Sequence, residues 1–149
     1  GNGIVMLSSL EAEGVSSVLL NNGELIAIES CPVKEEELAP VLGAVDKASI
    51  GAITGAVTER LAGHIADSYG RVTKRGKRDI KPSSIILAGS GATINGLTAL
   101  VSKKTGIETT VSNPFSKIAD DIQARFPDVS GVEAAFTTCY GLAMRALEE

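Results

Sequence analysis

The sequence is poor in aromatic residues. Phe, Tyr and Trp make up only 3% of its 149 residues, and Trp is absent. Proteins that bind single strands of nucleic acid stack bases on exposed rings, and this composition offers few of them. The net charge of −4 also gives the chain as a whole no attraction for polyanions. We therefore expect no nucleic-acid partner, and a core built from Val, Ile, Leu and Ala.

Cysteine and histidine are equally scarce. The two cysteines, Cys31 and Cys139, form neither a CxxC motif nor a disulfide framework, which fits a reducing, cytoplasmic compartment. His64 is the single histidine and is expected to be a helix-surface or half-buried residue, so we predict no metal site and no catalytic residue. No apolar run approaches the roughly 20 residues that span a bilayer, and no GxxxxGK[ST] phosphate loop occurs.

The first 30 residues predict an antiparallel meander. Residues 3–9 and 15–20 are apolar and favour strands, and residues 24–29 alternate between polar and apolar side chains as a half-buried strand does. Asn21-Asn22-Gly23 joins the second and third of these segments, and Asn-Gly accepts the positive φ angles of a type I′ hairpin turn. We expect three consecutive antiparallel strands here.

The rest of the chain alternates between helices and strands. Apolar residues at helical spacing predict a helix over residues 50–69, strands are expected at 84–88 and 107–111, and further helices at 94–103, 116–125 and 132–147. Cys139, in the last helix, is expected in the core. Residues 71–81 are basic and are interpreted as a turn-rich connector. The pattern predicts one α/β domain, residues 1–149, with a five-stranded mixed sheet, its first three strands antiparallel and helices on both faces.

Three segments of the second half resemble actin-like proteins. Residues 84–97 (SIILAGSGATINGL) resemble the strand, double-glycine turn and helix start found near the adenosine in the actin-like ATPase superfamily, whose core is a ribonuclease H-like domain. Asn113-Pro114-Phe115 and residues 140–145 (YGLAMR) are similar to segments of the PilM family of type IV pilus assembly proteins, and FtsA-like proteins share the ending more distantly. The resemblance covers residues 54–149 and implies the second, C-terminal domain of a two-domain protein. The start at Gly1-Asn2-Gly3, without Met, is interpreted as that of a fragment.

The resemblance also implies where a nucleotide would bind in an intact parent protein. The segment Gly89-Ser90-Gly91-Ala92 forms the double-glycine turn, and Ser8 and Ser9 stand at the first hairpin, where the family has an Asp-x-Gly for phosphate and metal. Without that Gly the backbone cannot approach phosphate as closely, and without the Asp a Mg²⁺ ion loses an oxygen ligand. ATP and Mg²⁺ are therefore implied only for the intact parent, and no cofactor is expected for this chain alone. The alternative for Gly89 and Gly91 is a tight turn that needs glycine for conformation alone.

Three functions stay open at this point. The first is a non-catalytic scaffold or interaction domain of a PilM-like pilus assembly protein, at the cytoplasmic face of the inner membrane and with protein partners there. The second is half of an ATP-binding cleft that needs a missing N-terminal domain, and the third is a degenerate actin-like module that self-associates. The altered hairpin favours the first and third, so the isolated chain is not expected to be an enzyme. Residues Arg71–Lys81, with a local balance of +5, offer weak membrane-surface contact, although a solvated connector is the preferred interpretation.

Overall fold

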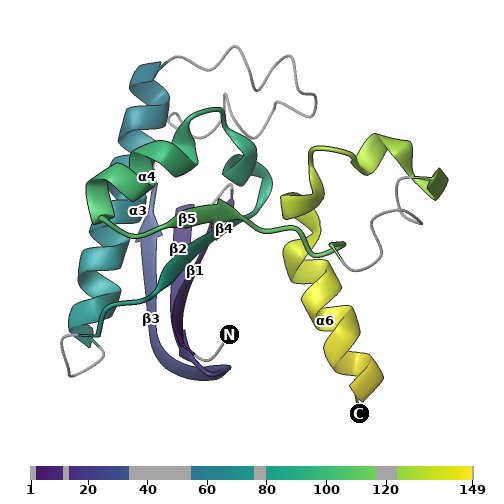
Figure 1. Cartoon of the computed structure of the whole chain (residues 1–149), viewed down its shortest axis with the longest axis horizontal. Coiled ribbons are helices and arrows are strands. Elements are labelled where there is room, and N and C mark those ends of the chain that lie inside the picture. Colours follow the sequence, from purple (N-terminus) through teal and green to yellow (C-terminus); the bar gives the residue numbers. More distant parts are fainter. Residues whose placement is uncertain (1–2, 12–13, 34–54, 76–79, 117–123, 149) are drawn as a thin grey trace.

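The computed structural model describes residues 3–11, 14–33, 55–75, 80–116 and 124–148. The predicted helix over residues 116–125 falls largely outside this range. In chain order the elements are β1 (Ile4–Glu11), β2 (Gly14–Asn21), β3 (Glu24–Pro32), α3 (Gly55–Arg75), β4 (Ser84–Ala88), the 3-10 turn η1 (Ser90–Thr93), α4 (Leu97–Thr105), β5 (Thr109–Val111), the 3-10 turns η2 (Pro127–Val129) and η3 (Glu133–Phe136), and α6 (Thr137–Glu148) (Figure 1).

The strands form a single five-stranded sheet in the order β3-β2-β1-β4-β5. β1, β2 and β3 are antiparallel neighbours, whereas β4 pairs in parallel with both β1 and β5. The predicted mixed sheet, with its first three strands antiparallel, is confirmed. The turn between β2 and β3 has positive φ at both central residues, 50° at Asn22 and 87° at Gly23, as a type I′ turn requires.

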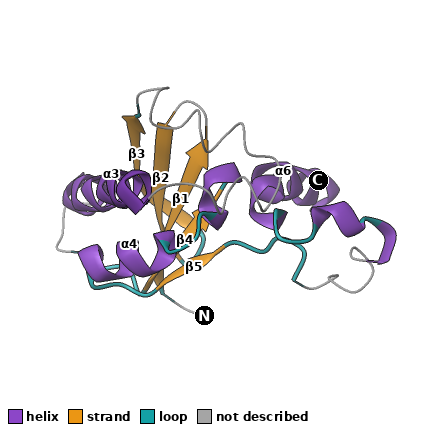
Figure 2. Ribbon diagram, turned by 90° about the horizontal axis from the view of Figure 1, so that it is seen from above, coloured by secondary structure: helices purple, strands orange, loops and turns teal. Residues whose placement is uncertain are grey.

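The helices lie on two sides of this sheet. α3 packs on β2 and β3, and α4 packs on α3 and β5, so one face of the sheet is covered. In both views of the molecule the sheet lies between α3 and α6 (Figures 1 and 2). The core forms beneath α3 and α4, where the largest fully buried side chains include Met6, Leu19, Leu61, Ile65 and Ile85.

A chain of three buried serine hydroxyls joins this helical layer to the sheet. Ser68 on α3 donates to Ser17 on β2 at 2.7 Å, and Ser17 and Ser8 on β1 share a second hydrogen bond at 2.8 Å. All three residues are at most 1% exposed. Because a buried hydroxyl without a partner is costly, these bonds let polar residues occupy the centre of a mainly aliphatic layer.

The end of α3 differs from the sequence prediction. Residues 71–75 belong to the helix and not to a turn-rich connector, because Val72 is buried one helical turn after Ser68 and continues the inward-facing row. The buried carboxylate of Glu29 fixes this last turn: Arg71 Nε donates to Oε1 at 2.9 Å, and Arg75 Nε lies 2.9 Å from Oε2. The second contact is an ion pair without hydrogen-bond geometry, since Oε2 has no hydrogen-bond partner. Both arginines therefore have a structural role.

The surroundings of Arg71 raise the pKa of its guanidinium. Partial burial lowers the pKa of its guanidinium, but the neighbouring Cys31 thiol and Glu29 carboxylate raise it by more, so the pKa lies above its ordinary value. The side chain thus stays cationic wherever the protein is folded.

Candidate functional site

The carboxyl ends of the parallel strands β1 and β4 meet at one edge of the sheet. Ligands of α/β sheets commonly bind outside the carboxyl ends of their strands, so this edge is the first place to look for a site. β1 ends at Glu11, and β4 is followed at once by Gly89 and η1. Ser90 donates to Glu11 Oε2 at 3.3 Å, and Ser9 donates to Oε1 at 3.4 Å. A carboxylate held by two hydroxyls therefore lies over the double-glycine turn.

Glycine is required at this turn by the close approach of β1. Gly89 has φ 88°, and a Cβ added there would lie 2.5 Å from the carbonyl oxygen of Leu10 and 2.6 Å from Glu11 Oε1. A Cβ at Gly91 would lie 2.3 Å from the Leu10 side chain. The end of β1 thus explains both glycines without a ligand, which supports the interpretation of a turn that needs glycine for its conformation and packing.

The other predicted cofactor-binding residues are placed differently. The Ser8 side chain is 1% exposed and lies in the serine chain beneath α3, where it is hydrogen-bonded to Ser17. Ser9 is half-buried and reaches the edge through its bond to Glu11. Ala92 is buried in η1. The edge therefore brings Ser9 and Ser90 together but not Ser8.

The residues of this edge that the structure describes do not form a phosphate site. The backbones of Ser8 and Ser9 lie within the sheet, paired with β2 on one side and β4 on the other, so they form no open turn of free amide groups. The space next to Gly89 already holds the Glu11 carboxylate, which repels an anion. Among the described residues there is also no group of three or more His, Cys, Asp or Glu side chains able to hold a metal ion.

Glu11 is the residue that sequence reasoning missed. The signal available was its position just beyond the first predicted strand, residues 3–9, in the loop that joins this strand to the second one. Attention to the hairpin's missing Asp placed the chemistry at Ser8, three residues earlier. The strand continues to Glu11, so the carboxylate at the end of β1 contacts the glycine turn, whereas Ser8 lies in the middle of the strand.

Two of the segments that resemble PilM proteins, Asn113–Phe115 and residues 140–145, contact each other next to this edge. Asn113 Oδ1 accepts a hydrogen bond from the Phe115 amide at 3.0 Å, which forms a tight turn and presents the Phe115 ring. That ring meets Tyr140 edge-on at 5.4 Å between centroids, and Phe136 at 6.0 Å. The Gly89 amide donates to the Ala134 carbonyl at 2.9 Å, so η3 and the base of α6 are tied to the glycine turn.

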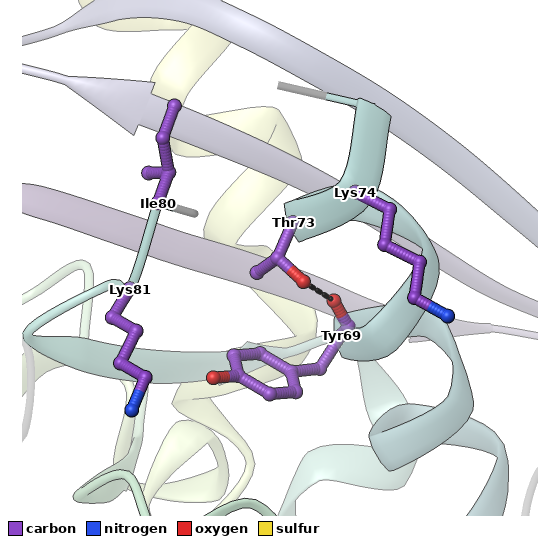
Figure 3. Close-up of a pocket in the computed structure, with 5 residues that line it drawn as sticks. All are labelled: Tyr69, Thr73, Lys74, Ile80 and Lys81. Carbon is purple, nitrogen blue, oxygen red and sulfur yellow. Dashed lines mark hydrogen bonds between the residues drawn. The ribbon is translucent and has the colours of Figure 1, made fainter. Parts of the chain in front are cut away.

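A cavity of about 390 Å³ lies elsewhere, beside the last turns of α3. Figure 3 shows Thr73 donating to the Tyr69 carbonyl, with the Tyr69 hydroxyl on the side of Lys81. The basic segment therefore has two parts: Arg71 and Arg75 hold Glu29, while two lysines line the cavity. Its described lining residues are Tyr69, Thr73, Lys74, Ile80 and Lys81.

Comparisons with solved structures identify the fold. The chain aligns with a protein of the "PilM-PilN type IV pilus biogenesis complex" at a TM-score of 0.73 and 18% identity, over 99% of this chain and 47% of that one. The ethanolamine utilization protein EutJ from Carboxydothermus hydrogenoformans gives 0.54 and 14%, over 90% and 49%. A ROK hexokinase from Thermus thermophilus gives 0.50 and 13%, over 80% and 37%. The fold is that of the actin-like ATPase superfamily, in a ribonuclease H-like domain.

The family follows from the sequence itself. The family model for the type IV pilus assembly protein PilM matches residues 63–147, more than half of the chain. The chain therefore belongs to the PilM family, although it spans less than half the length of these three similar structures. No curated protein matches the sequence. Within the described residues, no helix is both long and apolar enough to cross a membrane.

Proposed function

We propose that this chain is a non-catalytic scaffold domain of a type IV pilus assembly protein. It would form the second domain of a two-domain parent and hold protein partners of an assembly at the cytoplasmic face of the inner membrane. The family match supports a role in pilus assembly. The similar structure described as a PilM–PilN complex concerns another protein, and it supports the idea of a protein partner for this one.

The observation that carries the non-catalytic part is the position of Glu11. Its carboxylate occupies the space next to Gly89, bonded by Ser90 and Ser9, at the edge where an actin-like ATPase half would be expected to face nucleotide. A negative group at this place opposes a phosphate, and Leu10 fills the space above Gly91. The described part of this edge therefore supports a closed packing junction rather than an open phosphate cradle.

Isothermal titration calorimetry with Mg-ATP tests this proposal. The protein should be titrated both as this chain and as the product of its complete reading frame, with Glu11→Gln as the matched variant. We expect no saturable heat from any of them. In the organism that encodes it, Glu11→Gln should leave the amount of surface pilin unchanged. Saturable Mg-dependent binding by the complete protein, together with loss of surface pilin in the variant, would refute a purely structural role.

A second candidate is half of an ATP-binding cleft completed by the missing domain. It is favoured by one observation: Glu11, Ser9 and Ser90 lie at the carboxyl ends of adjacent parallel strands. A carboxylate there can accept hydrogen bonds from sugar hydroxyls, as acidic residues do in other nucleotide-binding folds. Under this candidate, Glu11→Ala would weaken nucleotide binding by the complete protein, whereas the scaffold proposal predicts no binding to lose.

A further inference from the structure

The cavity beside the last turns of α3 lies apart from the Glu11 edge. Two of its lining residues, Ile80 and Lys81, precede β4, whereas Gly89 follows it, so the cavity and the edge are at opposite ends of this strand. Its volume of about 390 Å³ falls within the range of roughly 300–1,000 Å³ that small-molecule pockets occupy. The cavity is therefore a separate hollow that is large enough for a small ligand.

The available polar groups of the cavity are hydrogen-bond donors. The Tyr69 hydroxyl lies on the side of Lys81 (Figure 3), and neither this hydroxyl nor the Lys81 ammonium group has a hydrogen-bond or ion-pair partner within the part of the chain that the structure describes. Thr73 donates to the Tyr69 carbonyl at 2.8 Å, so its hydroxyl hydrogen is already engaged. No carboxylate is among the described lining residues. These groups suit an anion.

The remaining described walls of the cavity are apolar. The Tyr69 ring and Ile80 are half-buried and pack against the hydrophobic core, so the core holds them in place. Lys74 extends its ammonium group away from Tyr69 and Lys81 (Figure 3), so it adds mainly its alkyl stem to the wall, as long lysine side chains commonly do. The cavity thus has a cationic end at Lys81 beside apolar walls, and it fits an anion that carries an apolar body.

The charge distribution of the chain favours a small anion over an extended one. Residues 71–81 carry +5 and the rest of the chain carries −9, which together give the net charge of −4. Charges in solution are screened beyond about 8–10 Å near physiological salt, so a single anionic group in the cavity interacts mainly with the nearby cations. A membrane surface or a nucleic acid extends further and would also meet the acidic remainder of the chain.

We propose that this cavity binds a small organic anion. Its carboxylate or phosphate group lies against the Lys81 ammonium group and the Tyr69 hydroxyl, and its short apolar body lies along the Tyr69 ring and Ile80. This goes beyond the scaffold function and does not depend on it, because no residue of the Glu11 edge takes part. The ligand would join the end of α3 to the segment that enters β4, so its binding should also stabilise the fold.

A titration of the chain followed by two-dimensional amide NMR tests this proposal with four probes. Phenyl phosphate and phenylacetate carry both an anionic group and an apolar body, inorganic phosphate lacks the apolar body, and benzyl alcohol lacks the charge. We expect at least one of the first two probes to shift the amide signals of Tyr69, Ile80 and Lys81 in a saturable way at about millimolar concentration, as probes of this size allow. Inorganic phosphate and benzyl alcohol should bind at least about five-fold more weakly.

Single substitutions locate the binding groups. Lys81→Gln should weaken binding of the anionic probe at least about five-fold, because a charge-assisted hydrogen bond is lost. Tyr69→Phe keeps the ring and removes the hydroxyl, and should weaken binding about two- to five-fold. Lys103→Gln is the matched control, since Lys103 is an exposed lysine of α4 that does not line the cavity, and it should leave binding unchanged. Circular dichroism checks that each variant is folded.

Four results would overturn the proposal. The first is the absence of saturable shifts with both phenyl phosphate and phenylacetate. The second is equal binding of benzyl alcohol or inorganic phosphate, which would show that the charge or the apolar body has no part in recognition. The third is an equal loss of binding in Lys103→Gln and Lys81→Gln, as expected for unspecific attraction to lysines. The fourth is sedimentation of the chain with phosphatidylglycerol vesicles that Lys81→Gln abolishes while the soluble probes fail to bind, since the cavity would then serve a membrane surface.

Discussion

The body of the molecule, made of the sheet with α3 and α4, and the C-terminal region, residues 124–148, use similar side chains in opposite ways. In the body, Met6, Leu61 and Ile65 are completely buried. In the C-terminal region the single fully buried hydrophobic residue is Ala134, while Leu142 and Leu147 are largely exposed. An apolar side chain stabilises a fold only where something covers it. The C-terminal region thus depends on contacts outside itself, whereas the body carries its own core.

The same substitution in each region should measure that difference most directly. Leu61→Ala removes a fully buried side chain and should lower the free energy of unfolding by about 3 kcal/mol. Leu147→Ala, at a position 82% exposed, should change it by less than about 0.5 kcal/mol. Urea denaturation followed by circular dichroism at low protein concentration gives both values. Equal losses at the two positions would show that the C-terminal region is part of the same core.

The junction between the regions should respond almost as strongly. Gly89→Ala combines a positive φ with a clash against the Leu10 carbonyl, and we expect a loss of about 3 kcal/mol. Gly96→Ala is the matched control, because Gly96 has φ 80° but nothing within 4 Å of an added Cβ. It should cost about 1 kcal/mol from backbone strain alone. The difference between the two isolates the close approach of β1, and thermal melts that shift equally would argue against that approach.

The serine chain should give an intermediate effect. Ser17→Ala removes the hydroxyl that receives Ser68 and pairs with Ser8, which leaves two buried hydroxyls short of a partner. We expect a loss of about 1–2 kcal/mol. Ser16→Ala, on the exposed side of the same strand, serves as the control and should be nearly neutral. If Ser17→Val stabilised the protein, the buried polar chain would be dispensable for stability.

Substitutions in the basic segment should change the free energy of unfolding least, and the change should differ between the neighbouring residues Lys74 and Arg75. Arg75→Glu loses the ion pair to Glu29 and sets two carboxylates side by side, so a loss of about 1 kcal/mol is expected, tempered by the exposure of Arg75. Lys74→Glu, beside the cavity, should stay within about 0.5 kcal/mol. Unfolding measured at low and high salt tests this, because the Arg75 effect should shrink with salt. If Lys74→Glu proved as costly as Arg75→Glu, the division of the segment into arginines that hold Glu29 and lysines that line the cavity would fail.

Sequence reasoning recovered the body far better than the C-terminal region. The alternation of residues 24–29 and the Asn22-Gly23 turn each have a local cause, so the meander was predictable, as was the parallel strand Ser84–Ala88. The last helix was also predicted, but the exposure of its side chains was not. Cys139 was predicted in the core and is exposed, because an apolar helix has the same sequence whether or not a partner covers it. Glu11 was missed because its importance comes from the approach of Gly89, which is 78 positions further along the chain.

The three buried serines have one more consequence, for the accuracy of folding. β1 and β2 pair so that Ser8 faces Ser17, and Ser68 on α3 completes the chain. A slip of β2 by one residue would turn Ser17 to the opposite face and bring Ser16 or Val18 toward the helix. With Val18 in that place, Ser8 and Ser68 would be buried without partners. Aliphatic side chains alone would tolerate such a slip more readily, so the buried hydroxyls disfavour the misaligned hairpin that brings Val18 toward α3.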